Sequence, residues 1–347
     1  MLTIGNWKSF IKTIQYGGGA VGVFLNSILI LLIVYRSPKT LGAYKYLMIY
    51  ISLFEIFYAI LNAITEGHIF SHGPAFIFFR LFKHSNFGRA EGIYLCIVYC
   101  GTFGLSIALF GVHFIYRYGA VDNVFRKRFL GGKKLLILFL IPIFYGVWWS
   151  LVVFVFFLPS PKTDAYMRIP LLEGYDTRIE DVSYVIILFW KIDDLSHMEP
   201  VWSTFIGISC LWFMVSSSFF CVIFFGIKCY RKITKALKNS KMSTYHARSI
   251  QKQLFQALVL QTLVPVILMY IPIGILYMFP MLNIEVGFIS SFVTATIEVY
   301  PAVDPLPTMF IVESYRKTLM CGCWSEKRDA EGAAVKVRSQ NSVPTIS

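Results

Sequence analysis

Charged residues are scarce in this sequence. Asp, Glu, Lys and Arg make up 15% of its 347 residues, whereas an ordinary globular domain carries about 25%. Hydrophobic residues account for 56% and aromatic residues for 17%. This composition excludes a soluble globular domain and predicts a membrane protein.

Patterns that indicate catalysis or a bound cofactor are also lacking. His68 and His72 have no adjacent Glu, and no histidine set has a plausible acid for holding a metal. The run Gly17-Gly18-Gly19 opens an apolar stretch, where it favours close helix packing rather than phosphate binding. The last apolar stretch has no Lys, which excludes a retinal Schiff base there. We therefore expect no enzyme activity, no metal and no cofactor.

Long apolar runs are the feature that the chain does have. Each is long enough for a helix to cross a hydrocarbon core, which takes about 20 residues. The seven predicted spans are Ile14–Tyr35, Tyr46–Glu66, Ile93–Tyr116, Leu135–Phe157, Ser203–Lys228, Leu254–Phe279 and Ile284–Ile311. The sequence therefore predicts an all-α membrane protein, a bundle of seven transmembrane helices.

Basic residues are sorted to one side of these spans. Arg36–Lys45, Arg117–Lys134, Lys228–Gln253 and the tail after Val312 hold 23 of the 32 Lys and Arg residues. Positive charge stays on the cytoplasmic side, so the N-terminus is expected outside and the C-terminus inside. The net charge of +13 then fits anionic membrane lipid as the partner rather than nucleic acid.

The spans divide the chain into three parts. Residues 1–13 are expected to form an extracellular tail, 14–324 the transmembrane domain, and 325–347 a disordered cytoplasmic tail. The first run is too long for a removable signal peptide. Cys321 and Cys323 follow the last span. Cysteines at this position are candidates for lipidation, and the sequence does not decide whether they carry it.

The longest outer segment is Leu158–Trp202, which holds eight acidic residues and no cysteine. A disulfide staple is therefore excluded there, although that side is oxidising. The segment forms either a small cap over the bundle or a solvated loop. We expect the loop, because runs of charge usually face solvent.

Polar residues recur along one face of the seventh span. Ser291, Thr294, Glu298, Pro301 and Pro305 follow one another at steps of three or four. Polar groups are costly in hydrocarbon, so this stripe is expected to face the other helices. Two roles for this stripe remain open. Its hydrogen bonds either only hold the bundle together or also serve the function.

Prolines interrupt the sixth and seventh spans. Pro265 and Pro272 share a face with Gln261, and each proline removes an amide donor from its helix. Asp304 lies among the prolines of the seventh span and can accept hydrogen bonds there. In the second span Glu55 needs a partner, for which Asn26 and Asp304 are candidates. A hinge at these prolines is a hypothesis, because prolines also occur in static membrane helices.

The third span ends in His113-Phe-Ile-Tyr-Arg-Tyr118. Taken alone, this run indicates an Arg117 that snorkels to the inner interface beside two belt tyrosines. Together with Gly42–Met48, Lys252–Pro265 and Tyr300–Pro307, however, it resembles the signatures of nematode serpentine chemoreceptors of the Str class. The Str class is similar to the diacetyl-type odorant receptor of worms. The resemblance of this chain to the class runs from the first span to about Cys323.

The resemblance implies a G-protein-coupled receptor for small odorants or soluble attractants and repellents, in the ciliary membrane of a chemosensory neuron. Arg117 would take the place of the arginine that ends the third helix of rhodopsin-type receptors, and Asp304-Pro305 that of their Asn/Asp-Pro. The chain departs from that pattern, since no acid precedes Arg117 and Thr308 stands where a tyrosine is usual. A seven-span ligand-gated ion channel is the alternative, but the insect odorant channels have the opposite orientation.

Two groups of residues follow as candidate sites. We expect a small molecule to bind in the outer half of the bundle, where aromatic rings and hydroxyls meet. Its predicted contacts are Tyr94, Tyr99, Trp212, Tyr270, Ser291 and Thr294. The predicted switch and surface for a G-protein α subunit comprise His113, Tyr116, Arg117, Tyr118, Arg231, Lys232, Pro265, Pro301, Asp304 and Pro305.

Overall fold

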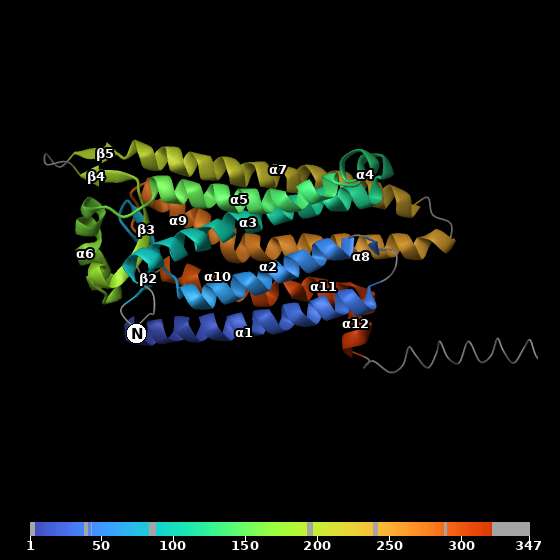
Figure 1. The fold of residues 1–347 in the computed structure, drawn as a ribbon, viewed down its shortest axis with the longest axis horizontal. Helices are drawn as coiled ribbons and strands as arrows, with labels where there is room; N and C mark the ends of the chain where they lie inside the picture. Colours follow the sequence, from blue (N-terminus) through green and yellow to red (C-terminus); the bar gives the residue numbers. More distant parts are fainter. Residues whose placement is uncertain are drawn as a thin grey trace, which may run out of the picture.

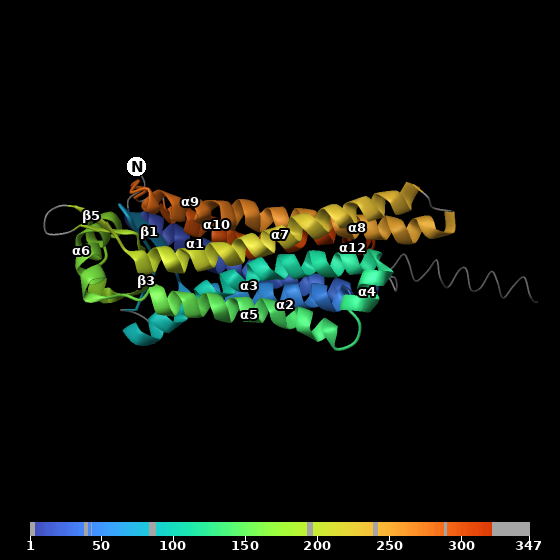
Figure 2. The ribbon, with the colours of Figure 1, turned by 90° about the horizontal axis from the view of Figure 1, so that it is seen from above.

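Long helices run side by side along the molecule, with a small sheet at one end (Figures 1 and 2). This computed structural model describes residues 4–37, 41–42, 44–82, 88–192, 197–238, 242–287 and 290–320. The predicted tail 325–347 and both lipidation candidates, Cys321 and Cys323, lie outside these residues. The sheet end also holds the start of the first helix, and α4 and α12 lie at the opposite end.

Among the described residues, six helical stretches are long and apolar enough to cross a membrane. They comprise α1 (Ile4–Arg36), α2 (Tyr44–Thr65), α3 (Arg89–Val121), α5 (Lys134–Phe156), α7 (Trp202–Lys238) and the unit from α8 to α9. The seventh predicted span is divided into α10 (Ser291–Val303) and α11 (Pro305–Ile311). It begins later than the predicted Ile284, because Gly287 pairs in extended form with Ser71.

A wide helical turn separates the two prolines of the sixth span. Helix α8 (Met242–Pro265) is followed by a π-helical turn, η3 (Val266–Tyr270), and then by α9 (Ile271–Met281). Proline lacks the amide donor and its ring crowds the preceding turn, so the regular α-helical ladder is interrupted. The predicted irregularity at Pro265 is therefore present, in the form of a π turn.

The polar stripe of the seventh span faces the bundle, as predicted. Ser291, Thr294 and Glu298 are all less than 5% exposed. Pro305 cannot donate to the carbonyl of Pro301, and the side-chain amide of Asn26 donates to that carbonyl instead, at 3.0 Å. A neighbouring helix thus satisfies a backbone group that the proline left free.

The end of the bundle that bears the sheet is the predicted outer end and is called so below, and the opposite end is called the inner end. The outer end carries a cap, so the prediction of a solvated loop for Leu158–Trp202 is wrong. Strands β1 (His68–His72), β2 (Ala75–Leu81) and β3 (Val182–Leu188) form an antiparallel sheet in that order. Helix α6 (Pro161–Tyr175) packs on the sheet, and η2 (Ile179–Asp181) leads into β3. The short pair β4 (Trp190–Ile192) and β5 (Met198–Pro200) lies between the cap and α7.

The two faces of β2 pack on different partners because side chains alternate along a strand. Ile77 and Phe79 join the cluster under α6, whereas Phe76 and Phe78 join the core of the bundle. The Phe78 ring stacks on Tyr99 of α3, with centroids 4.8 Å apart. With both faces covered, the strand is a nearly continuous apolar run without polar alternation.

The inner end is built from short helices. Asp122 caps α4 (Asn123–Phe129) by accepting a hydrogen bond from the amide of Phe125. Helix α12 (Glu313–Met320) is tied to the connection after α1 through the hydroxyls of Tyr315 and Ser37, 2.7 Å apart.

Candidate functional site

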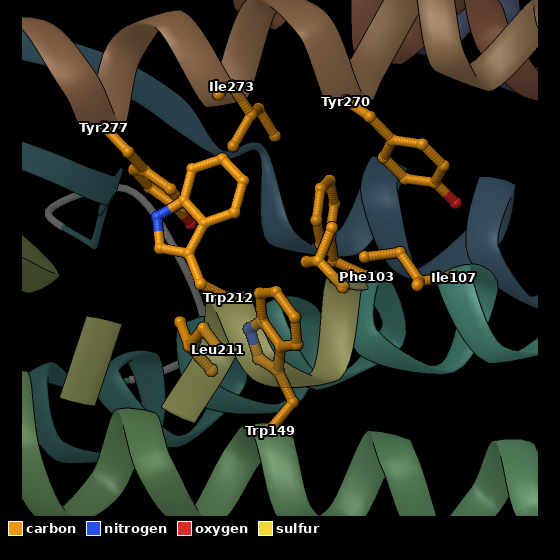
Figure 3. Close-up of a pocket in the computed structure, with 10 residues that line it drawn as sticks. Phe103, Ile107, Trp149, Leu211, Trp212, Tyr270, Ile273 and Tyr277 are labelled. Carbon is orange, nitrogen blue, oxygen red and sulfur yellow. The ribbon is translucent and has the colours of Figure 1, made fainter. Parts of the chain in front are cut away.

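An aromatic pocket lies in the outer half of the bundle. Its volume is about 40 Å³, and about 15 Å³ suffices for a water molecule. Its walls come from α3, α5, α7, η3 and α9, whose side chains converge on one space (Figure 3). The lining residues are Phe103, Ile107, Trp149, Leu211, Trp212, Val215, Tyr270, Ile273, Gly274 and Tyr277.

None of these ten residues is charged. The hydroxyl of Tyr270 lies 3.1 Å from the Ser106 hydroxyl of α3, so one polar pair borders the pocket. Trp149 is fully buried and its ring lies 5.3 Å from that of Phe103. This lining suits a largely apolar molecule that carries at most one or two hydrogen-bonding groups. A cavity that binds benzene measures about 150 Å³, so side chains must move to admit such a molecule.

The predicted ligand contacts fall in four places. Tyr270 and Trp212 line the pocket. Tyr94 is 61% exposed on the outside of α3, away from the pocket lining. Tyr99 is buried beneath Phe78, with its hydroxyl 3.1 Å from that of Tyr58.

Ser291 is fully buried and does not line the pocket, and Thr294 serves the cap instead. The Thr294 hydroxyl accepts a hydrogen bond from the Ile69 amide of β1, at 3.1 Å. One turn earlier, Ser290 accepts from the amide of Ser71. The hydroxyls of Thr294 and of Ser290, which directly precedes α10, thus bind the edge of the sheet, and depth along the helix alone did not reveal this.

Sequence reasoning missed Trp149 and Tyr277 as pocket residues. Both lie in apolar runs with no polar stripe to orient the helix, since α5 contains neither acid nor base after its first residue. The adjacent Trp148 and Trp149 therefore looked equivalent, although Trp148 is 46% exposed and Trp149 2%. Packing of α5 against α3 decides between them.

Arg117 lies buried at the inner end of α3, so the snorkelling interpretation is wrong. Its guanidinium donates to the backbone carbonyl of Gln251 in α8 and lies 5.0 Å from the ring centroid of Tyr44 in α2. Its side chain is fully buried, and its Nε has no hydrogen-bond partner among the described residues. A buried charge with so few partners is costly, which leaves this contact poised for exchange.

His113 lies one helical turn before Arg117 and holds the same tyrosine. Its Nε2 is 2.5 Å from the hydroxyl of Tyr44. Tyr116 also stacks on Tyr44, with ring centroids 5.7 Å apart. Three of the predicted switch residues, His113, Tyr116 and Arg117, therefore meet around the ring of Tyr44.

Tyr118 and Lys232 meet at Asp122 on the rim of the inner end. Tyr118 donates to Asp122 at 3.0 Å, and Lys232 of α7 forms an ion pair with the same carboxylate. Hydrogen bonds from Lys232 and from the Phe125 amide lower the pKa of Asp122 to about 2. Arg231 precedes Lys232 in α7 and is exposed.

Buried acids connect the second, sixth and seventh spans. Tyr300 donates to Glu55, and the amide of Gln261 donates to the Asp304 side chain at 3.3 Å and to its backbone carbonyl at 3.2 Å. Pro265, Pro301 and Pro305 are buried around this network. Of the two predicted partners of Glu55, Asn26 binds Pro301 instead, and Asp304 accepts its hydrogen bonds from Gln261.

Within the described ranges, no group of three His, Cys, Asp or Glu side chains is arranged to hold a metal ion. The comparisons with known proteins then decide the class of the molecule. Residues 11–320 match the family described as serpentine type 7TM GPCR chemoreceptor Str. The chain belongs to the Str family of serpentine chemoreceptors. This is a family of seven-transmembrane receptors and not of enzymes.

Individual relatives and a solved structure agree with this family. The Str chain is 37% identical over 324 residues to the G-protein coupled receptor str-217 of Caenorhabditis elegans, which covers 91% of this chain and 92% of the relative. It is 28% identical to the serpentine receptor class r-10 of the same species, over 98% of both chains. Squid rhodopsin matches the fold with a TM-score of 0.58 at 9% identity, over 99% of this chain and 94% of that one.

Proposed function

We propose that this Str receptor binds a small odorant in the outer aromatic pocket and activates a heterotrimeric G protein at its inner end. The observation that carries the proposal is the continuity of the sixth span. The unit α8–η3–α9 supplies Tyr270 to the pocket wall and, five helical turns away, the Gln251 carbonyl to Arg117. Its π turn between Pro265 and Pro272 lies between these two contacts.

A ligand acts on such a unit through its differential affinity for two conformations. Movement of Tyr270 by the ligand changes the conformation of η3, to which Tyr270 belongs, and so moves α8. Displacement of Gln251 in α8 then frees the guanidinium of Arg117 to bind the α subunit. Gln261 of the sixth span binds Asp304 of the seventh span. Because Pro301 and Pro305 flank Asp304, this contact links the irregular parts of the two spans. Tyr116, Tyr118, Arg231 and Lys232 then contribute the surface around Arg117.

The orientation is part of the same proposal. The inner end carries the basic residues of α4 and α12 and the cluster at Asp122, whereas the outer end carries the cap. The positive-inside rule therefore supports an extracellular N-terminus and a cytoplasmic C-terminus. The Str family supports a role in odour sensing and chemotaxis, with the receptor in the ciliary membrane of a sensory neuron.

Calcium imaging against a panel of small odorants tests the function. Receptor-expressing cells should respond to at least one member, and the response should vanish in cells that lack the Gα subunits. A response that persists without Gα would favour the ion-channel alternative. Staining of a tag on Ser347 without permeabilisation would reverse the proposed orientation.

A further inference from the structure

We infer that the aromatic pocket opens into the hydrocarbon of the bilayer, between α7 and α9, and not to the extracellular water. The portal is formed by Trp212 and Gly274. The inference rests on the proposed function in assigning the pocket to ligand, and it names the class of ligand as a neutral, lipophilic molecule that partitions into membranes.

The cap closes the extracellular route. Phe76 of β2 meets the pocket residue Tyr277 edge to face, with centroids 5.4 Å apart. The Trp190 indole donates to the carbonyl of Met281 at 2.8 Å, which ties β4 to the end of α9. With β1 bonded to α10 as well, the sheet lies across the mouth with both faces buried.

The side wall between α7 and α9 is open by comparison. Trp212 lines the pocket and is yet 42% exposed, whereas Trp149 on the opposite wall is 2% exposed. Gly274 also lines the pocket, and a Cβ added there would meet nothing within 4 Å. The pocket is therefore covered on this side by one movable indole rather than by an interlocked helix contact.

The depth of the opening decides which solvent it meets. Trp212 lies ten residues into α7, so it is about 15 Å from Trp202 at the outer end of that helix. Gly274 lies about 10 Å from the end of α9 at Met281 by the same rise. Since the hydrocarbon core is about 30 Å thick, both residues lie at hydrocarbon depth.

The lining gives the chemistry of the ligand. Ten uncharged residues surround the space, and the hydroxyls of Tyr270 and Ser106 supply the polar pair at its border. A charged or strongly hydrated molecule would lose its hydration both in the bilayer and in the pocket. A small molecule with a single hydrogen-bonding group suits both the route and the site.

Tryptophan quenching in reconstituted receptor tests the portal without requiring any signal. Wild-type receptor is compared with Trp149→Phe, Trp212→Phe and Trp148→Phe, so that each difference reports one indole. Three quenchers are used: phosphatidylcholine brominated on its acyl chains, bromoform dissolved in the bilayer, and acrylamide in the water. Trp148 is 46% exposed on α5 and serves as the lipid-facing control.

Brominated chains should remove more than half of the Trp212 and Trp148 emission and leave Trp149 unchanged. Bromoform should quench Trp149 as well, because it can enter the pocket from the bilayer. Acrylamide should quench none of the three indoles. Gly274→Leu should abolish quenching of Trp149 by bromoform. Gly17→Leu, at a glycine of α1 that also has open space beside it, should not.

Quenching of Trp149 or Trp212 by acrylamide would show an opening to water and overturn the inference. A Trp149 that bromoform does not reach would overturn it too. An odorant panel without a response would instead count against the proposed function, and the quenching pattern would be unaffected.

Discussion

The two ends of this receptor are held together in different ways. At the outer end a three-stranded sheet with paired registers is buried on both faces, and its edge donates backbone hydrogen bonds to Ser290 and Thr294. At the inner end Arg117 crosses between helices with one carbonyl and one aromatic ring as its contacts. The sheet at the outer end is one interlocked unit, whereas the Arg117 contact at the inner end is separable from its surroundings.

This difference fits a receptor whose inner end moves. Many small contacts must be lost together to open the sheet, so we expect its strands to unfold as one cooperative unit. The Arg117 contact can exchange one partner at a time, and a buried guanidinium gains from a new carboxylate or carbonyl partner. The experiments below would break or sharpen this contrast.

The largest effect is expected from Arg117→Ala. It removes the contact with Gln251 and the proposed anchor for the α subunit. Odorant sensitivity should therefore fall by about tenfold or more, which is the usual size of the coupling between two sites of a receptor. Dose–response curves at equal surface expression measure this. Arg168→Ala, at an exposed arginine of α6 in the cap, should leave the sensitivity unchanged. Normal signalling by the Arg117 variant would refute its coupling role.

Phe79→Ala should strongly destabilise the outer cap. The ring is fully buried and meets Tyr175 edge to face at 5.1 Å, and its loss should cost about 3–5 kcal/mol. A thermal shift of the purified receptor measures the change. Ile169→Ala, 63% exposed on α6, should stay within about 0.5 kcal/mol. Equal shifts in the two variants would mean that the cap is not a packed unit.

Acid should loosen the cap through His68. Burial, with a smaller contribution from Lys8, lowers the pKa of His68 to about 4, and its Nδ1 is 3.0 Å from the Tyr175 hydroxyl. The unfolded ring titrates near pH 6.5, so the cap is most stable above that pH and loses stability as the pH falls toward 4. Between pH 7 and pH 5 the loss should be about 2 kcal/mol.

Hydrogen exchange of the β1 amides, corrected for the intrinsic effect of pH, measures this loss. His68→Gln removes the titrating ring and should abolish the pH dependence, whatever its effect on stability. The same pH dependence in the His68→Gln protein would assign the effect to another group.

The smallest effect is expected in the pocket. Tyr270→Phe removes the hydroxyl that meets Ser106, and a lost neutral hydrogen bond costs about 1 kcal/mol, or roughly fivefold in odorant sensitivity. Tyr94→Phe alters a tyrosine on the outside of α3 and should leave the dose–response curve in place. Equal shifts in both variants would contradict the assignment of the pocket.

Much of the helical framework was predictable from the sequence. The seven apolar runs predicted the spans, and the steps of three and four predicted that Ser291, Thr294 and Glu298 face inward. Prolines predicted the irregular sixth and seventh spans, because the loss of an amide donor is local chemistry. Each of these features depends on neighbours within a turn or two of helix.

The cap and the pocket were not predictable in the same way. Strand β2 pairs with β3 across more than a hundred residues, joining Ala75 to Leu188, and no local pattern specifies such a partner. Tyr94 and Trp149 lie in apolar helices where every face is equally suited to lipid. Their places depend on which helix each one meets.

The sequence by itself determined that this chain crosses a membrane, which stretches cross it, and which family of receptors it belongs to. These follow from the cost of polar groups in hydrocarbon and from motifs that are contiguous in the chain. The tertiary structure alone decided that the outer end is closed by a sheet, that Arg117 is buried against α2 and α8, and that the pocket has an open side. Contacts between distant segments set these features, because a helix face or a strand edge acquires its partner only when the bundle packs.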